Sequence, residues 1–338
     1  MNVLNQYLQV INSVFPCIVL MFIGFLSIYI IGSDNYQHIT SISQNIAIPV
    51  RTIYILGTNP FVLDDLKIIC SLFLTQFIGA VIIIPFLFIF KVQQKLKTFA
   101  AVLSVIQINN CITGIPFYSG IYSSILPKYG YMQILVNFGI CLPIINTCFE
   151  YPEQQNKLTQ IICQQILKTV KHPQIIAIVL GIAFNLAYYG FHSPKLLFLE
   201  KFSNSCGALI PPFGLISIGM LAHQKFVEKQ NIKQELVMYS KKTYKSKIIN
   251  IIVLQLMRHC ALPVVLISLC KGFKIKKQEI VEISVSIYTQ PCQIISYTMC
   301  NKYNKLSEVA VFDLVFGTMT VLTITPILQF ICYLLWRE

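Results

Sequence analysis

The sequence predicts an all-α membrane protein with ten transmembrane helices, built as two inverted repeats of five helices each. Three observations indicate this fold class. The chain has 338 residues, of which 55% are hydrophobic and only 12% charged, whereas a soluble domain carries about 25% charged residues. Its mean hydropathy is +0.67, and many of its apolar runs are long enough to cross a bilayer. Two of these runs are interrupted at their centre by proline and amide residues, a pattern that is typical of secondary transporters.

The charge and cysteine content narrow the classes of function. The formal net charge is +13, from 26 Lys and Arg against 13 Asp and Glu. Because the basic residues lie in loops beside predicted spans, they indicate topology and contact with the lipid bilayer rather than binding of nucleic acid. The 12 cysteines form no zinc spacing, so we expect no metal and no cofactor. Since HExxH, GxSxG, P-loop and Rossmann glycine motifs are all missing from the sequence, we expect no enzyme.

The first predicted repeat, residues 1–150, contains five spans. They are residues 10–31, 41–56, 64–90, 99–126 and 129–149. The second of these spans contains Pro49, Arg51 and Thr52. An arginine inside an apolar span is expected to face the interior of the bundle or to reach the membrane interface. Asp64 begins the third span, where its carboxylate can cap the first turn of a helix.

A short connector, residues 151–171, separates the repeats and is predicted to be cytoplasmic. Within it, residues 158–170 have apolar side chains at near-helical spacing, which suits a helix on the membrane surface. The second predicted repeat covers residues 172–338. Its five spans are residues 172–189, 203–223, 248–270, 284–300 and 309–336. An odd number of spans in each half inverts the second repeat relative to the first.

The distribution of lysine predicts the orientation of the chain. The loops after the odd-numbered spans carry more lysine than the loops on the other side, and residues 224–247 alone hold seven. Positively charged loops favour the cytoplasmic side, so we predict that both termini are non-cytoplasmic. The sequence does not distinguish the plasma membrane from the endoplasmic reticulum.

The fourth predicted span is interrupted in its middle. Pro116 lacks an N–H group and cannot continue a regular helix, and the neighbouring Thr113 and Gly114 weaken the helix further. Asn109 and Asn110 add amides that lipid cannot satisfy. Broken backbone at membrane depth occurs only where it is buried in protein or lines a water-filled cavity, so we expect the middle of this span to face such a site.

The ninth predicted span is interrupted in the same way by Gln290, Pro291 and Gln293. The half-helices that would follow Pro116 and Pro291 direct the partial positive charge of their N-termini at the break. Two interrupted spans, one in each half, therefore predict an anion-binding site at a crossing of the two spans. The alternative is a pair of proline-kinked helices that serve only in packing.

Several polar residues have two interpretations each. The amides of Asn109 and Asn110 can bind a substrate carboxylate or bond the carbonyl groups that the broken helix frees. Gln290 and Gln293 are the symmetric candidates, and the hydroxyl groups of Thr113 and Thr52 lie beside candidate positions. Arg51 can place a positive charge on the cavity wall or extend to the membrane interface.

Three further charged or titratable residues lie inside the last spans. Arg258 and His259 are expected to act as structural partners of a carbonyl group or an acid at the depth of the cavity. Asp313 is expected to be a buried hydrogen-bonding acid or to lie near the interface.

A series of short motifs follows one another along the chain. They are Pro49 with Arg51-Thr52, Asn109 through Gly114-Ile115-Pro116, Tyr129-Gly130, Met257-Arg258 with Pro263, and Thr289-Gln290-Pro291. In order and spacing these motifs resemble the auxin efflux carrier family, which includes the PIN-formed and PIN-like membrane transporters. The resemblance covers nearly the whole chain, although the large central loop of long plant members is missing.

The resemblance implies an elevator-type carrier that works as a homodimer. Spans 1, 2, 6 and 7 would form a scaffold, and spans 3–5 and 8–10 would form the moving part, with spans 4 and 9 crossing at Pro116 and Pro291. The implied substrate is a small organic anion, such as indole-3-acetate or a dicarboxylate, and Asp64 would be a proton or support site. Two other functions stay open, namely a sensor or receptor that keeps the carrier fold, and a cation-coupled symporter similar to the bile-acid carriers.

Overall fold

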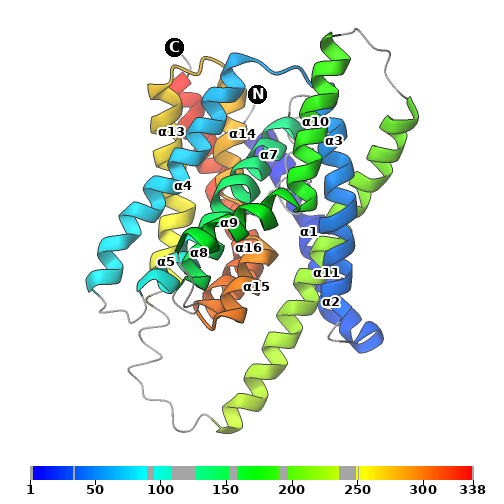
Figure 1. Cartoon of the computed structure of the whole chain (residues 1–338). Helices are drawn as coiled ribbons and strands as arrows, with labels where there is room; N and C mark the ends of the chain where they lie inside the picture. The colour runs from blue at the N-terminus through cyan, green and yellow to red at the C-terminus, as the bar shows by residue number, and fades with distance from the viewer. Residues whose placement is uncertain are drawn as a thin grey trace.

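The described part of the chain is built of α-helices (Figure 1), and several of them are long and apolar enough to make this an integral, multi-pass membrane protein of the all-α class. In the part of the chain that the computed structural model describes, four helices are long and apolar enough to span a membrane, or up to six if each of two bent helix pairs counts as one span. The all-α membrane class is therefore confirmed, and the ten-span repeat stays a prediction. The structure describes residues 3–32, 35–89, 95–108, 126–151, 158–190, 197–235, 249 and 251–336.

The first half of the chain forms helices at each predicted span that the structure describes. These elements are α1 (Val3–Ile31), α2 (Tyr36–Ile42), η2 (Ser43–Ala47), α3 (Ile48–Thr58), α4 (Leu63–Ile89), α5 (Lys95–Ile106), α7 (Leu126–Ile134), η4 (Leu135–Cys141) and α8 (Leu142–Glu150). The segments α2, η2 and α3 follow one another without a break, so the second predicted span belongs to a longer helix. Of the fourth predicted span, the structure describes residues 99–108, which are the rest of α5 and the two residues after it, and Leu126, where α7 begins.

The second half contains the interruption that the sequence predicts. Its elements are α9 (Leu158–Val170), α10 (Pro173–Gly190), α11 (Leu197–Glu235), η6 (Met257–Ala261), α13 (Leu262–Gly272), α14 (Gln278–Tyr288), α15 (Ile294–Lys302) and α16 (Ser307–Trp336). The ninth predicted span is two helices, α14 and α15, separated by a short non-helical segment. The connector helix α9 has the predicted bounds; it buries Ile161 and Gln165 and exposes Ile162 and Ile166.

Three helices widen into a π-helical turn that ends two residues before a proline. The turns are η2, η4 and η6, and the prolines are Pro49, Pro143 and Pro263. Proline has no N–H to donate and its ring collides with the carbonyl group four residues earlier, so a wider turn at that carbonyl relieves the collision. The turn η4 carries Asn137, and η6 carries Arg258 and His259. Proline therefore sets the local backbone of residues that meet at the site described below.

The helices pack in two groups, which stand side by side in Figure 1. In the first group α1 packs along α11 and α3 along α10. The α1–α11 contact is a contact between backbones: a Cβ atom added at Gly24 would lie 2.2 Å from the Ile216 carbonyl oxygen, and one at Gly219 would lie 1.9 Å from the Met21 carbonyl oxygen. Glycine at these two positions lets the helices approach this closely.

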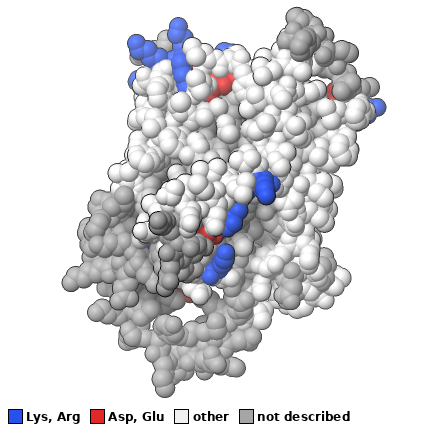
Figure 2. Space-filling model, viewed as in Figure 1, with Lys and Arg blue, Asp and Glu red and all other residues white. Residues whose placement is uncertain are grey.

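The second group contains α4, α5, α7, α8, α13, α14, α15 and α16. Within it α4 packs on α13, α5 on α8 and α15, and α14 on α16. On the face drawn in Figure 2 most of the described surface is uncharged, with basic side chains at the upper left and in the centre of the view. Large apolar side chains such as Phe22 and Leu186 are exposed, as expected for helices that face lipid.

Candidate functional site

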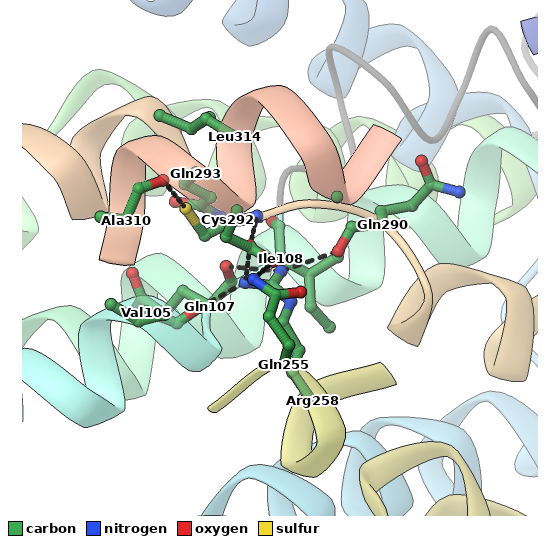
Figure 3. Close-up of polar contacts among 12 residues, drawn as sticks. Val105, Gln107, Ile108, Gln255, Arg258, Gln290, Cys292, Gln293, Ala310 and Leu314 are labelled. Carbon is green, nitrogen blue, oxygen red and sulfur yellow. Dashed lines mark hydrogen bonds and ion pairs between the residues drawn. The ribbon is translucent and has the colours of Figure 1, made fainter. Parts of the chain in front are cut away.

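Two helix ends that are far apart in sequence meet in the second group of helices (Figure 3). The helix α5 ends at Ile106, and the chain between α14 and α15 passes beside the next two residues. Ile108 and Cys292 form an isolated antiparallel bridge, and the Gln293 N–H donates to the Gln107 carbonyl oxygen at 3.2 Å. We call this contact between residues 107–108 and 289–293 the crossing.

Arg258 lies at the centre of the crossing and is 1% exposed. Its Nη1 donates to the Val105 carbonyl oxygen and, at 2.5 Å, to the Asp313 carboxylate. Its Nη2 donates to the carbonyl oxygens of Gln107 at 3.2 Å and of Gln290 at 2.7 Å. The last carbonyl groups of a helix have no partner within that helix and carry partial negative charge. The guanidinium group therefore bonds carbonyl groups at the C-terminal ends of both α5 and α14.

Asp313, on α16, is fully buried and completes this arrangement. Its Oδ2 accepts from the Cys292 N–H at 2.6 Å as well as from Arg258, and its Oδ1 accepts from Gln255 Nε2 at 2.8 Å. The Nε2 atom of His259 lies 3.1 Å from the same Oδ1. A buried carboxylate needs both a cation and several donors to be stable away from water. The expectation that Arg258 and His259 pair with carbonyl groups and an acid is confirmed.

The end of α5 is also held by a cluster of neutral amides, which the sequence reading missed. Asn137 Nδ2 donates to the Ile108 carbonyl oxygen at 3.2 Å, and Gln107 Nε2 donates to the Asn137 carbonyl oxygen at 3.3 Å. Asn137 Oδ1 accepts from Gln76 Nε2 at 2.8 Å and from Gln133 Nε2 at 2.9 Å. Polar side chains within apolar spans often bond between helices, so Gln76 and Asn137 carried a signal in the sequence.

The predicted residues of the ninth span lie at the crossing. Gln293 Nε2 donates to the Ile108 carbonyl oxygen at 2.8 Å, and Gln290 Nε2 to the Ser286 carbonyl oxygen at 3.4 Å. In Figure 3 the Gln290 side chain points away from Arg258, although its backbone oxygen is bonded to it. Pro291 lies in the non-helical segment between α14 and α15. Of the fourth-span candidates, Asn109, Asn110, Thr113, Gly114 and Pro116 lie outside the described residues.

Arg51 and Thr52 belong to a different part of the molecule. Arg51 Nη1 donates to Ser203 Oγ at 3.2 Å and to Asn204 Oδ1, so the side chain connects α3 with α11. Its guanidinium carbon lies 5.9 Å from the centre of the Tyr54 ring. Thr52 is fully buried and its hydroxyl donates to the Ile48 carbonyl oxygen of its own helix at 2.8 Å. The structure therefore does not bring these two residues together with the partners of Arg258.

Asp64 lies in the first turn of α4, and its Oδ1 accepts from Lys67 Nζ at 2.9 Å. The capping contact is made by its neighbour: Asp65 Oδ2 accepts from the Val62 N–H at 2.7 Å. A side chain that returns to the backbone N–H three residues earlier is the acidic half of a capping box. Asp65 is also paired with Lys128, which is almost fully buried. The helix-capping role thus belongs to Asp65.

No protein-family model matches the sequence, and no curated protein matches it either. The crossing is therefore the main basis for a functional conclusion. Among the described residues, no three His, Cys, Asp or Glu side chains come together as a group that could hold a metal ion.

Proposed function

We propose that this protein is a secondary transporter that moves a small organic anion across the membrane by an elevator-type alternating-access mechanism. The observation that carries the proposal is the crossing, where the break between α14 and α15 is tied to the end of α5. Non-helical backbone at membrane depth is tolerated only inside protein or beside a cavity, and in many transporters such breaks form the substrate site.

The charges at the crossing favour an anion as the cargo. The helix α15 begins at Ile294, directly after the break, and the first N–H groups of a helix carry partial positive charge. Arg258 adds little net charge because Asp313 is bonded to it. The donors for an anion would therefore be the N-terminus of α15 and the amides of Gln290 and Gln293, joined by Asn109 and Asn110.

The two packing groups suggest which parts would move. In the group of α1, α3, α10 and α11, the contacts at Gly24 and Gly219 join the backbones of α1 and α11, and α3 packs along α10, which makes the group suited to act as a rigid scaffold. The group that contains the crossing would carry the anion past this scaffold. We expect two copies of the chain to associate through their scaffold groups.

A transport assay with the purified full chain in proteoliposomes tests the proposal. Uptake of labelled indole-3-acetate, malate and similar acids is compared with uptake by empty liposomes, and we expect at least one acid to enter faster. Gln293→Ala should reduce that uptake by about tenfold, since a lost hydrogen bond to a charged group is worth 1.5–3 kcal/mol. Gln278→Ala is the matched control, because Gln278 bonds to Glu282 near the start of α14.

Two results would contradict the proposal. One is uptake that equals that of empty liposomes for every acid, although gel filtration shows a folded protein. The other is an equal loss of uptake in Gln278→Ala and Gln293→Ala, which would mean that the crossing is not the substrate site.

A further inference from the structure

The surroundings of Arg258 have the composition of a cation site. A guanidinium group has two N–H bonds on each Nη atom. At Arg258 these two atoms together have four oxygen partners: the carbonyl groups of Val105, Gln107 and Gln290, and the carboxylate of Asp313. Backbone carbonyls at half-helix C-termini, together with carboxylates, are the ligands that hold free cations in membrane transporters. Here a side chain of the protein occupies that position.

The charges around this position require a cation. The C-terminal ends of α5 and α14 each contribute a partial charge of about −0.5, and the buried Asp313 contributes a full negative charge. Gln255 and His259 also face the carboxylate, but Gln255 is a neutral amide, and a protonated His259 would offset only one of these negative charges. Without the Arg258 charge, these groups would leave an uncompensated negative charge away from water, which is strongly unfavourable.

The Ile108 carbonyl group, directly after α5, shows that not every carbonyl group at the crossing requires a cation. The Ile108 carbonyl oxygen is bonded by the neutral amides of Asn137 and Gln293. Asn137 is in turn bonded by Gln76 and Gln133, and no charged side chain takes part in these contacts. The cation requirement is therefore specific to the oxygens that surround Arg258.

We propose that the Arg258 guanidinium is a resident cation that fills this site, so that the protein holds its crossing together without binding a free metal cation. Removing the side chain is expected to leave a vacant site that accepts a free guanidinium ion. This inference concerns the folded crossing and does not depend on whether the protein is a transporter.

The test measures thermal unfolding of the purified full chain in detergent, for the native sequence and for Arg258→Ala. We expect Arg258→Ala to have a lower Tm, and guanidinium chloride at low millimolar concentration to raise that Tm saturably by about 5 °C. Urea has nearly the same shape without the charge, so it should have no such effect. The Tm of the native chain should not respond to guanidinium, and it should be equal in sodium and choline chloride.

Arg51→Ala is the matched control, because Arg51 bonds to Ser203 and Asn204, and no carboxylate among the described residues forms an ion pair with it. Its Tm should not respond to guanidinium. An equal response in both variants, or no response in Arg258→Ala, would overturn the proposal. So would a native chain that sodium stabilises relative to choline, because the native site would then bind a free cation.

If Arg258→Ala does not yield folded protein, a second pair of variants tests the proposal. Arg258→Lys keeps the charge and Arg258→Gln removes it, while both keep a long side chain. The proposal requires the lysine variant to have the higher Tm or the higher yield of monodisperse protein. A lysine variant that is no better than the glutamine variant would overturn it.

Discussion

Two kinds of chemistry hold the carbonyl groups that follow the helix ends at the crossing. The Ile108 carbonyl group after α5 is bonded by neutral amides, with Asn137 at their centre, whereas the Gln290 carbonyl group after α14 is bonded by Arg258, which is paired with the buried Asp313. Both solutions supply donors to carbonyl groups that a continuous helix would have satisfied internally. The comparison shows that carbonyl groups beyond a helix end can be bonded by neutral side chains or by an ion pair within one molecule. The loss of one partner should cost more free energy of unfolding in the ion pair than among the neutral side chains.

The ionic side should show the largest effect. Asp313→Asn keeps the shape of the side chain but leaves the buried Arg258 without its counter-charge, so we expect a loss of about 3–5 kcal/mol in the free energy of unfolding. Unfolding by sodium dodecyl sulfate in mixed micelles measures this loss. The double variant Arg258→Gln/Asp313→Asn should lose less than the sum of the two single variants, because the partners are coupled. Additive losses would mean that the pair is not an energetic unit.

The close contact between α1 and α11 lies outside the crossing, and the free energy of unfolding that it contributes can be compared with the loss expected for Asp313→Asn. Gly219→Ala places a methyl group against the Met21 backbone, which cannot move aside as a side chain can. We expect the helices α1 and α11 to separate slightly, at a cost of about 1–3 kcal/mol. Gly272→Ala is the control, because nothing lies within 4 Å of a Cβ atom added there. If both variants unfold at the same detergent concentration, the close approach of α1 and α11 carries no stability.

The neutral side should be less sensitive than the ionic side. Asn137→Leu removes the donor to the Ile108 carbonyl oxygen and the acceptor for Gln76 and Gln133. We expect a loss of about 2 kcal/mol in the same unfolding experiment, because unpaired buried neutral groups cost about 1–3 kcal/mol. A loss that exceeds the one measured for Asp313→Asn would reverse the comparison between the two sides.

The smallest effect is expected at Arg51. Arg51→Ala removes contacts between α3 and α11 in a half-buried position, so we expect a loss of about 1 kcal/mol or less. If an anion is transported, its KM should stay within about twofold of the native value, because the partners of Arg51 lie on α11 and not at the crossing. A tenfold rise in KM without loss of stability would instead place Arg51 in the substrate site.

Much of this architecture could be predicted from residue types along the chain. The break around Pro291 follows from proline and amides within an apolar run, and the pairing of Arg258 follows from the cost of a charge in an apolar span. The bounds of α9 follow from apolar spacing. Each of these features depends on residues close together in the sequence or on the apolar membrane around them, so a single segment of sequence is enough to predict it.

The partners could not be predicted in the same way. Nothing near Arg258 in the sequence indicates Val105 or Gln107, which reach it only because α5 ends beside the break after α14. The roles of Asn137 and Gln76 were missed for the same reason. At the start of α4 the choice between Asp64 and Asp65 depends on a difference of one position along the helix.

The sequence alone determined that this chain lies in a membrane, that one of its helices breaks at Pro291, and that an arginine within an apolar span must be compensated. Hydropathy, the missing N–H of proline and the cost of burying a charge are properties of the residues themselves. Only the tertiary structure decided which oxygens surround Arg258 and that Arg51 serves a different contact. Hydrogen bonds need atoms within about 3 Å of each other, and for residues on different helices the packing of those helices alone sets that distance.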